Sequence, residues 1–326
     1  MTIDVCEVKK RLKALLNNDD NLVNNYLRRY GPGVDIKNIK AVKEESSRSL
    51  QVAQEEEGED PIYEITLTCP VCGRDDVPGY ELRAKSQQVR QNLFLVPVYT
   101  GAMGFRTMDF TLLAVSVCPR CLFASPDKKD FVRMKPTGNE EIKSQLTANA
   151  IMTLQEKIGE RKAILRSASD YAAYFSRPRT YDAAIDSYRL SMSRATVEQW
   201  YEQPYATYKS GAYALRIAKI MKDCGRDNRE ALREGLGLYE EAFRSSNCPA
   251  EEIEMQIIYT VVALYLKLGD LKKAHSYIAV FTNLVNQRKI EIKEDPSLNL
   301  VTIERWQEKA NRLWEDRERD DLFTNE

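Results

Sequence analysis

Four cysteines in two Cys-Pro-x-Cys pairs constrain this chain more than any other feature of its sequence. One pair spans Cys69–Cys72 and the other Cys118–Cys121, and each puts two thiols on one tight turn. A tetrahedral Zn²⁺ ion takes four such ligands, and a shell of four cysteines leaves no open coordination position. The sequence therefore predicts one structural Zn²⁺ ion, held by Cys69, Cys72, Cys118 and Cys121.

Two other interpretations of the cysteines are weaker. A thiol redox motif occurs singly in a βαβ setting, whereas here the pair is repeated and each copy follows a β-like run. A disulfide framework is disfavoured because the cysteine count is odd and the N-terminus resembles no export signal. Residues 73–117 separate the pairs, against about 15–20 residues in most zinc ribbons. The spacing predicts an enlarged hairpin between the two turns.

Length and charge limit the remaining possibilities. A chain of 326 residues suggests about two domains, and 43% apolar residues are enough for real cores. The formal charge of −1 argues against a global attraction to nucleic acid or membrane. No run of 18 apolar residues could span a bilayer. Free thiols without an export signal lead us to expect a cytoplasmic protein.

The chain divides by pattern into three segments. Residues 1–60 predict a helical extension, with helices at 3–16 and 20–30 and an acidic linker at 55–60. Residues 61–135 predict a zinc-ribbon-like β domain with β-rich runs at 62–68, 94–99 and 110–117. Residues 136–326 predict an α-helical domain. The expected fold class is thus α+β and predominantly α.

Repeating helical hairpins are predicted in the last segment. The clearest covers Met255–Phe281 and turns at Gly269-Asp270, in a pattern that resembles the tetratricopeptide repeat. The same pattern recurs at Tyr208, Gly211, Ala212 and Leu215, at Gly235, Tyr239 and Ala242, and at Ala184 and Tyr188. The steps between copies exceed the usual 34 residues or so, so a generic helical bundle stays open beside the degenerate TPR-like array. A long helix is expected at 140–165 and a capping helix at 298–317.

The paired cysteine motifs, Phe123-Ala124 and Asp130-Phe131 resemble the bacterial family called domain of unknown function 2225. The resemblance covers about Thr66–Phe281 and implies a zinc-ribbon head with a TPR-like helical tail. It also implies that the four paired cysteines are the metal ligands. One departure is Leu122, which follows the second pair where glycine is usual. The family has no assigned activity to carry over.

No catalytic constellation is evident in the sequence. His275, the single histidine, falls inside a predicted repeat helix and is best interpreted as a half-exposed helix residue. No phosphate-binding glycine loop and no close carboxylate pair in an apolar setting occur. We therefore expect that the protein is not an enzyme.

The leading hypothesis is a scaffold or adaptor that docks a protein or peptide through the helical repeats. The TPR-like pattern places six residues on the concave face, in a mixture suited to an acidic or C-terminal peptide: Lys209, Tyr213, Arg216, Gln256, Tyr259 and Leu266. A nucleic-acid-binding zinc ribbon is the alternative, although ten Lys/Arg and seven Asp/Glu in residues 61–135 leave little net charge once a Zn(Cys)₄ centre is included. A metal-dependent enzyme is the least favoured.

Overall fold

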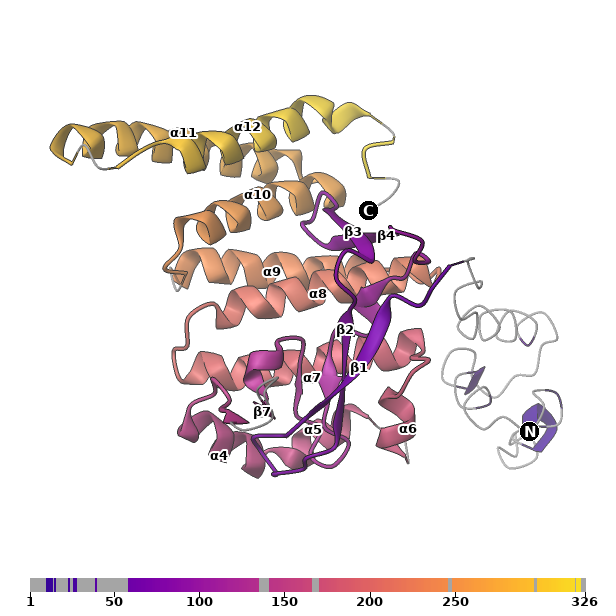
Figure 1. Ribbon diagram of the computed structural model, residues 1–326. Coiled ribbons are helices and arrows are strands. Elements are labelled where there is room, and N and C mark those ends of the chain that lie inside the picture. Colours follow the sequence, from indigo (N-terminus) through magenta and orange to yellow (C-terminus); the bar gives the residue numbers. More distant parts are fainter. Residues whose placement is uncertain are drawn as a thin grey trace, which may run out of the picture.

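The computed structural model describes residues 10–13, 15, 23, 26–27, 39, 58–134, 141–165, 170–245, 248–295, 298–319 and 321–323. Of the predicted helices at 3–16 and 20–30 and the acidic linker at 55–60, the structure describes only residues 10–13, 15, 23, 26–27 and 58–60, and the rest of these predictions lies outside the described residues. Residues 58–134 form a β-rich head that lies alongside a stack of helices (Figure 1). Within the described residues, no helix is long and apolar enough to cross a membrane.

Four two-stranded antiparallel pairs make up the β structure of the described chain. They are β1 (Ile62–Leu67) with β2 (Val77–Leu82), β3 (Gln87–Gln91) with β4 (Pro97–Gly101), β5 (Ser116–Val117) with β6 (Ala124–Ser125), and β7 (Arg133–Met134) with β8 (Glu141–Ile142). Two 3₁₀ turns, η1 (Phe110–Leu112) and η2 (Lys128–Asp130), join them. The strand predicted at 62–68 is confirmed by β1.

The chain between the two cysteine pairs differs from the single enlarged hairpin that we expected. It contains a second hairpin, β3–β4, because the Asn92 side chain accepts hydrogen bonds from the backbone of Phe94 and Val96 and turns the chain there. The β run predicted at 94–99 therefore begins only at Pro97. The run predicted at 110–117 shrinks to β5, since Asp109 caps η1 at its start.

Helices fill the rest of the described chain. They are α4 (Ala148–Glu156), α5 (Ile158–Ile164), α6 (Tyr171–Phe175), α7 (Tyr181–Trp200), α8 (Ala206–Asp223), α9 (Arg229–Ser245), α10 (Glu251–Leu268), α11 (Leu271–Glu294) and α12 (Val301–Glu315), followed by the 3₁₀ turn η3 (Asp316–Glu318). The single helix predicted at 140–165 is wrong. Thr147 caps α4 at its start, and the chain breaks at Lys157, where the dihedral angles leave the helical region.

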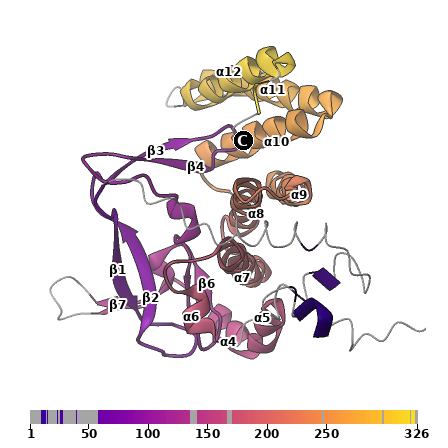
Figure 2. The ribbon, with the colours of Figure 1, turned by 90° about the vertical axis from the view of Figure 1, so that its right-hand side faces the viewer.

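Helices α7 to α12 stack one after another and form an array. Figure 1 shows these helices from the side, and Figure 2 shows them after a turn of 90°. The predicted hairpin is confirmed, because α10 ends at Gly269 with φ 84° and Asp270 caps α11. Gly235 lets α9 approach α8, since a Cβ there would lie 2.9 Å from Leu215. The predicted capping helix is α12, whose Trp306 ring packs 5.3 Å from that of Tyr259 on α10.

The head and the array share one apolar core. Phe94, Val96, Val115, Val117 and Leu122 of the head belong to the same buried cluster as residues of α7 to α12. A second cluster around the paired cysteines includes Ala150 and Leu154 of α4 and Val197 of α7. The domain boundary predicted at 135/136 stays a prediction, and the core of the described residues is continuous across it.

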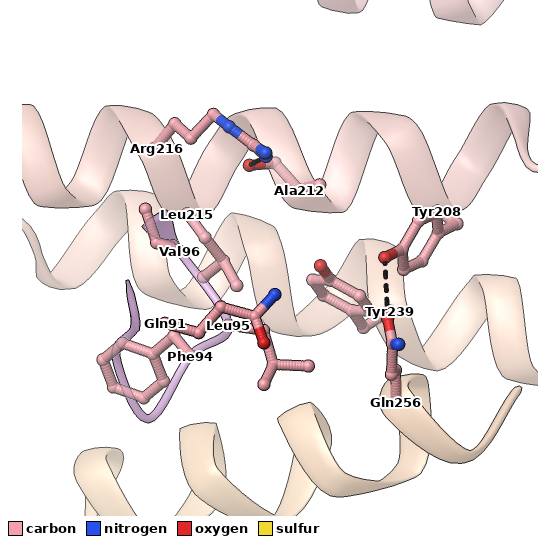
Figure 3. A pocket seen from close by; sticks show the side chains of 10 residues that line it. All are labelled: Gln91, Phe94, Leu95, Val96, Tyr208, Ala212, Leu215, Arg216, Tyr239 and Gln256. Atoms are coloured by element: carbon pink, nitrogen blue, oxygen red, sulfur yellow. Dashed lines mark hydrogen bonds between the residues drawn. The ribbon is translucent and has the colours of Figure 1, made fainter. Parts of the chain in front are cut away.

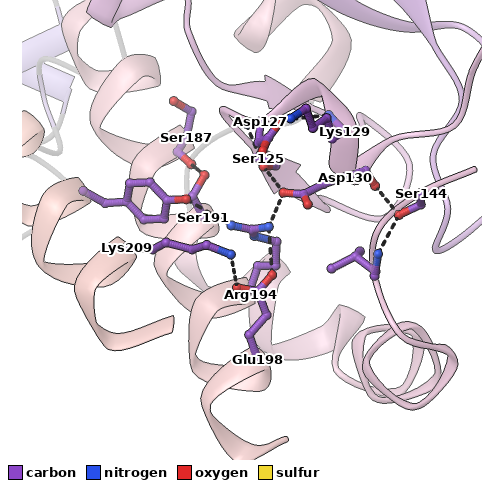
Figure 4. A network of polar contacts seen from close by, with 12 residues as sticks. Ser125, Asp127, Lys129, Asp130, Ser144, Ser187, Ser191, Arg194, Glu198 and Lys209 are labelled. Atoms are coloured by element: carbon purple, nitrogen blue, oxygen red, sulfur yellow. Dashed lines mark hydrogen bonds and ion pairs between the residues drawn. The ribbon is translucent and has the colours of Figure 1, made fainter. Parts of the chain in front are cut away.

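A buried polar network joins the two parts as well (Figure 4). Arg194 of α7 is only 1% exposed and binds Asp130 of the head, Glu198 at 3.0 Å and the Tyr213 hydroxyl at 3.0 Å. Asp130 also accepts a hydrogen bond from Ser125 at 2.5 Å. Burial raises the pKa of Asp130, and the positive charge of Arg194 opposes that shift. The arginine therefore offsets part of the cost of burying this carboxylate.

Replacing Arg194 by Met should lower the free energy of unfolding by about 3–5 kcal/mol, because Asp130 would be left buried without its cation. Arg189→Met is the matched control on the same helix. Arg189 pairs with Glu234 at the surface, where such a pair contributes about 0–1 kcal/mol. Denaturant unfolding followed by circular dichroism measures both, and equal losses in the two variants would contradict the role assigned to Arg194.

Candidate metal centre

Two turns of the same geometry carry the paired cysteines. The first lies between β1 and β2 and the second between β5 and β6. In each, the residue after the second cysteine donates its N–H to the carbonyl of the first cysteine at 2.9 Å: Gly73 to Cys69, and Leu122 to Cys118. The turns thus point two thiols each toward one place from separate hairpins.

Leu122 adopts the left-handed backbone that glycine usually occupies. Its φ is 59°, against 72° at Gly73 in the first turn. The Leu122 side chain is fully buried in the core shared with the array, whereas a Cβ at Gly73 would meet nothing within 4 Å. Apolar burial on this scale stabilises a side chain by about 1.5–3 kcal/mol, which offsets the backbone cost of roughly 1–3 kcal/mol. The leucine at this position therefore anchors the second turn to the helices through its buried side chain.

The four sulfur atoms converge on one point. All four Sγ atoms lie within 4.8 Å of one another, and the Cys69–Cys121 and Cys72–Cys118 pairs are each 3.5 Å apart. Cys69, Cys118 and Cys121 are buried, and Cys72 is half-buried. Sulfurs bound to one tetrahedral metal at about 2.3 Å would lie roughly 3.8 Å apart. The cluster can therefore hold a metal ion, as predicted from the spacing of the pairs.

Thiols packed this closely do not all ionise by themselves. Hydrogen bonding to Cys118 raises the pKa of Cys69 and raises that of Cys121 to about 12. The same contacts, from Cys121 first, lower the pKa of Cys118 to about 2. Thiols become metal ligands by losing their protons, so metal uptake here releases protons and weakens as the pH falls.

Side chains of the helical part donate hydrogen bonds to the backbone of each cysteine turn. The Gln155 amide of α4 donates to the Val71 carbonyl at 2.5 Å. Arg161 of α5 is completely buried and donates to the Cys121 carbonyl at 3.1 Å and the Leu154 carbonyl at 2.6 Å. Four thiolates around a divalent ion carry −2, so a cation in this position offsets part of that charge. The sequence analysis missed Arg161, because nothing in its local pattern separates it from a surface arginine.

Of the six residues predicted to line a concave groove, Tyr213, Tyr259 and Leu266 are buried, and Lys209 is partly exposed. Tyr213 is 5% exposed and accepts a hydrogen bond from Arg194, and Lys209 pairs with Glu198 at 3.0 Å. Tyr259 and Leu266 are buried in the core shared with the array. For Tyr259 and Leu266, the reason is that α10 is covered by its neighbours α9, α11 and α12.

The other two, Arg216 and Gln256, line a cavity of about 110 Å³ between the array and the tip of the β3–β4 hairpin (Figure 3). His275 lies exposed on α11, with its ring 5.3 Å from Trp314, as expected of an ordinary helix residue.

The head and the array together define a class of proteins in which a cluster of four cysteines, able to hold a metal ion, is built onto stacked helical hairpins. Residues 62–308 match the family described as "Uncharacterized protein conserved in bacteria (DUF2225)", and the chain belongs to that family. The family resemblance stated from the cysteine motifs is thereby confirmed. No curated protein and no solved structure matches the chain.

Replacing Arg161 by Leu should weaken metal retention about 10- to 100-fold, because the buried charge beside the thiolates is lost. Competition with a chromogenic chelator measures the affinity, with far-ultraviolet circular dichroism as the check on folding. Lys162→Leu removes a charge from the next residue, which is exposed, and should leave retention unchanged. Unaltered affinity in a folded Arg161→Leu variant would contradict the charge-compensating role.

Proposed function

We propose that the four cysteines hold one structural Zn²⁺ ion and that the protein is a non-catalytic scaffold that docks a protein or peptide partner. The convergence of four sulfurs within 4.8 Å carries the metal part of the proposal. Tetrahedral thiolate sites favour zinc among common divalent ions, with iron–sulfur chemistry as the other occupant of such sites. Zinc fits a centre that fastens two hairpins and needs no redox change.

A structural role fits the surroundings of the centre better than a catalytic one. Four cysteine ligands complete a tetrahedral shell, so no position is left for a water molecule or substrate. The sole histidine lies on α11, in the part of the array remote in sequence from the head, and packs against Trp314. Zinc would therefore act here by holding the head together and against α4 and α5.

The scaffold part of the proposal rests on the helical array. Stacked helical hairpins, if they are TPR-like, present elongated surfaces on which other proteins dock. Of the predicted contact residues, Arg216 and Gln256 border a cavity, and we infer that docking centres there. The exposed Gln91 at the hairpin tip would lie at the edge of such an interface.

Three cations of the head are engaged within the protein and offer little support for nucleic-acid binding. Arg74 pairs with Asp76, Arg106 lies 3.8 Å from Asp60, and Lys128 donates to the Ala114 carbonyl and the Ser116 hydroxyl. Charges engaged in this way are poorly placed to neutralise phosphates. The protein or peptide partner is therefore the function that we retain.

The purified protein should contain one equivalent of zinc by plasma mass spectrometry. Cys118→Ser should lose that zinc and unfold cooperatively at lower temperature, because structural zinc contributes about 10–16 kcal/mol of apparent binding energy in small domains. Cys224→Ser is the matched control, since Cys224 lies in α8's C-terminal turn and outside the cluster. Protein purified without chelator and lacking stoichiometric metal would refute the centre.

The docking role can be tested by photo-crosslinking in a native cell, with the reactive residue placed at Gln91. We expect one dominant adduct with a protein partner, lost in Arg216→Glu because the charge at the cavity is inverted. Arg233→Glu carries the same charge change on the exposed side of α9 and should keep the adduct. An adduct that survives Arg216→Glu, or no adduct at all, would count against docking at this site.

A further inference from the structure

The cavity between the head and the array is lined by a positive charge without a negative one. Its lining comes from the tip of the β3–β4 hairpin and from α8, α9 and α10, in the arrangement of Figure 3. The ten lining residues are Gln91, Phe94, Leu95, Val96, Tyr208, Ala212, Leu215, Arg216, Tyr239 and Gln256. They include one cation and no carboxylate. The cavity volume of about 110 Å³ is far above the roughly 10–15 Å³ that admits one water molecule.

Arg216 is the cation, and its charge is not neutralised by the described chain. The guanidinium donates to the carbonyl of Ala212 at 2.9 Å, one turn back on its own helix. Among the described residues no carboxylate lies within ion-pair distance of it, whereas the nearby Lys219 pairs with both Asp109 and Asp223. A half-buried guanidinium has five N–H donors in a planar fork that matches a carboxylate. Most of those donors remain available to a ligand.

Tyr239 supplies a second donor. Tyr239 is only 3% exposed, and its hydroxyl points into the cavity in Figure 3. No residue of the described chain makes a hydrogen bond to that hydroxyl, although the neighbouring Tyr208 hydroxyl bonds Gln256 at 3.2 Å. Burial raises the pKa of Tyr239, so the hydroxyl keeps its proton and acts as a donor. The hydroxyl is open to the cavity and can donate to an acceptor that enters from outside the chain.

The rest of the lining is mixed. Apolar side chains of Leu95 and Leu215 lie there together with the amides of Gln91 and Gln256. A carboxylate with a short aliphatic chain would use both the donors and the leucine side chains.

We propose that this cavity binds a carboxylate group attached to a short aliphatic chain, with the carboxylate on Arg216 and Tyr239 and the chain against Leu95 and Leu215. A free short-chain carboxylic acid and the C-terminal residue of a polypeptide share this chemistry. The site stands independently of partner docking, because a small acid could occupy it without any protein partner.

Calorimetric titration of the full-length, metal-loaded protein tests the proposal with two probes. Butyrate represents the free acid and N-acetyl-leucine the chain terminus, and their uncharged counterparts are butyramide and N-acetyl-leucinamide. We expect saturable binding of at least one acid and at least tenfold weaker binding of its amide. Binding of butyrate alone assigns a free acid, and binding of N-acetyl-leucine assigns a chain terminus.

Variants locate the binding. Arg216→Gln should raise the dissociation constant at least tenfold, and Tyr239→Phe should raise it several-fold while keeping the ring that packs 5.8 Å from Tyr208. Arg233→Gln, on the exposed face of α9, should leave it unchanged. Absence of saturable binding by either acid, equal binding of acid and amide, or wild-type affinity in both Arg216→Gln and Tyr239→Phe would overturn the proposal. If the acids bind but no protein partner is crosslinked at Gln91, this inference holds and only the proposed docking role is refuted.

Discussion

The position of the head on the helices depends on the polar contacts that buried arginines of the helical part make with it. Arg161 reaches the carbonyl of Cys121, and Arg194 reaches Asp130. Arg179, just before α7, donates to the carbonyl of Val115 at 2.8 Å and to that of Phe175 at 2.7 Å. Each arginine satisfies polar groups of the head that apolar packing alone would leave without partners. A buried guanidinium tolerates little displacement of its acceptors, so these contacts specify how the head sits on the helices more strictly than the shared apolar core does.

The features that sequence predicted well are those decided within a few residues. The two cysteine turns and the Gly269-Asp270 reversal follow from local spacing and capping, and the structure confirms them. Arg161, Arg179 and Arg194 could not be found in this way, because each sits in a polar stretch that also suits a solvated helix face. Their burial is decided by strands far away in the chain. The burial of Tyr259 could not be predicted for the same reason, since its contact with Trp306 depends on how α12 folds back.

The long separation of the cysteine pairs has a structural explanation. Residues 73–117 include the β3–β4 hairpin, whose tip enters the core of the array through Phe94 and Val96. The Phe94 ring also stacks on that of Phe323, at 5.9 Å, near the end of the described chain. A zinc ribbon with a short connection between its cysteine pairs would have no hairpin to reach the core of the array. The insertion therefore builds one wall of the cavity that Arg216 and Tyr239 line from the helices.

Metal binding and packing of the array are coupled through the second cysteine turn. Leu122 holds a left-handed backbone within that turn and at the same time fills the core shared with α7 to α12. Without a metal, the thiols of Cys69 and Cys121 resist ionisation and the two turns lose the ion that would join them. The strain at Leu122 would then be opposed by apolar burial alone, and Arg161 would face a turn free to move. Loss of metal should thus loosen the contacts of the head with α5 and α7 as well as the head itself, because the same residues serve both.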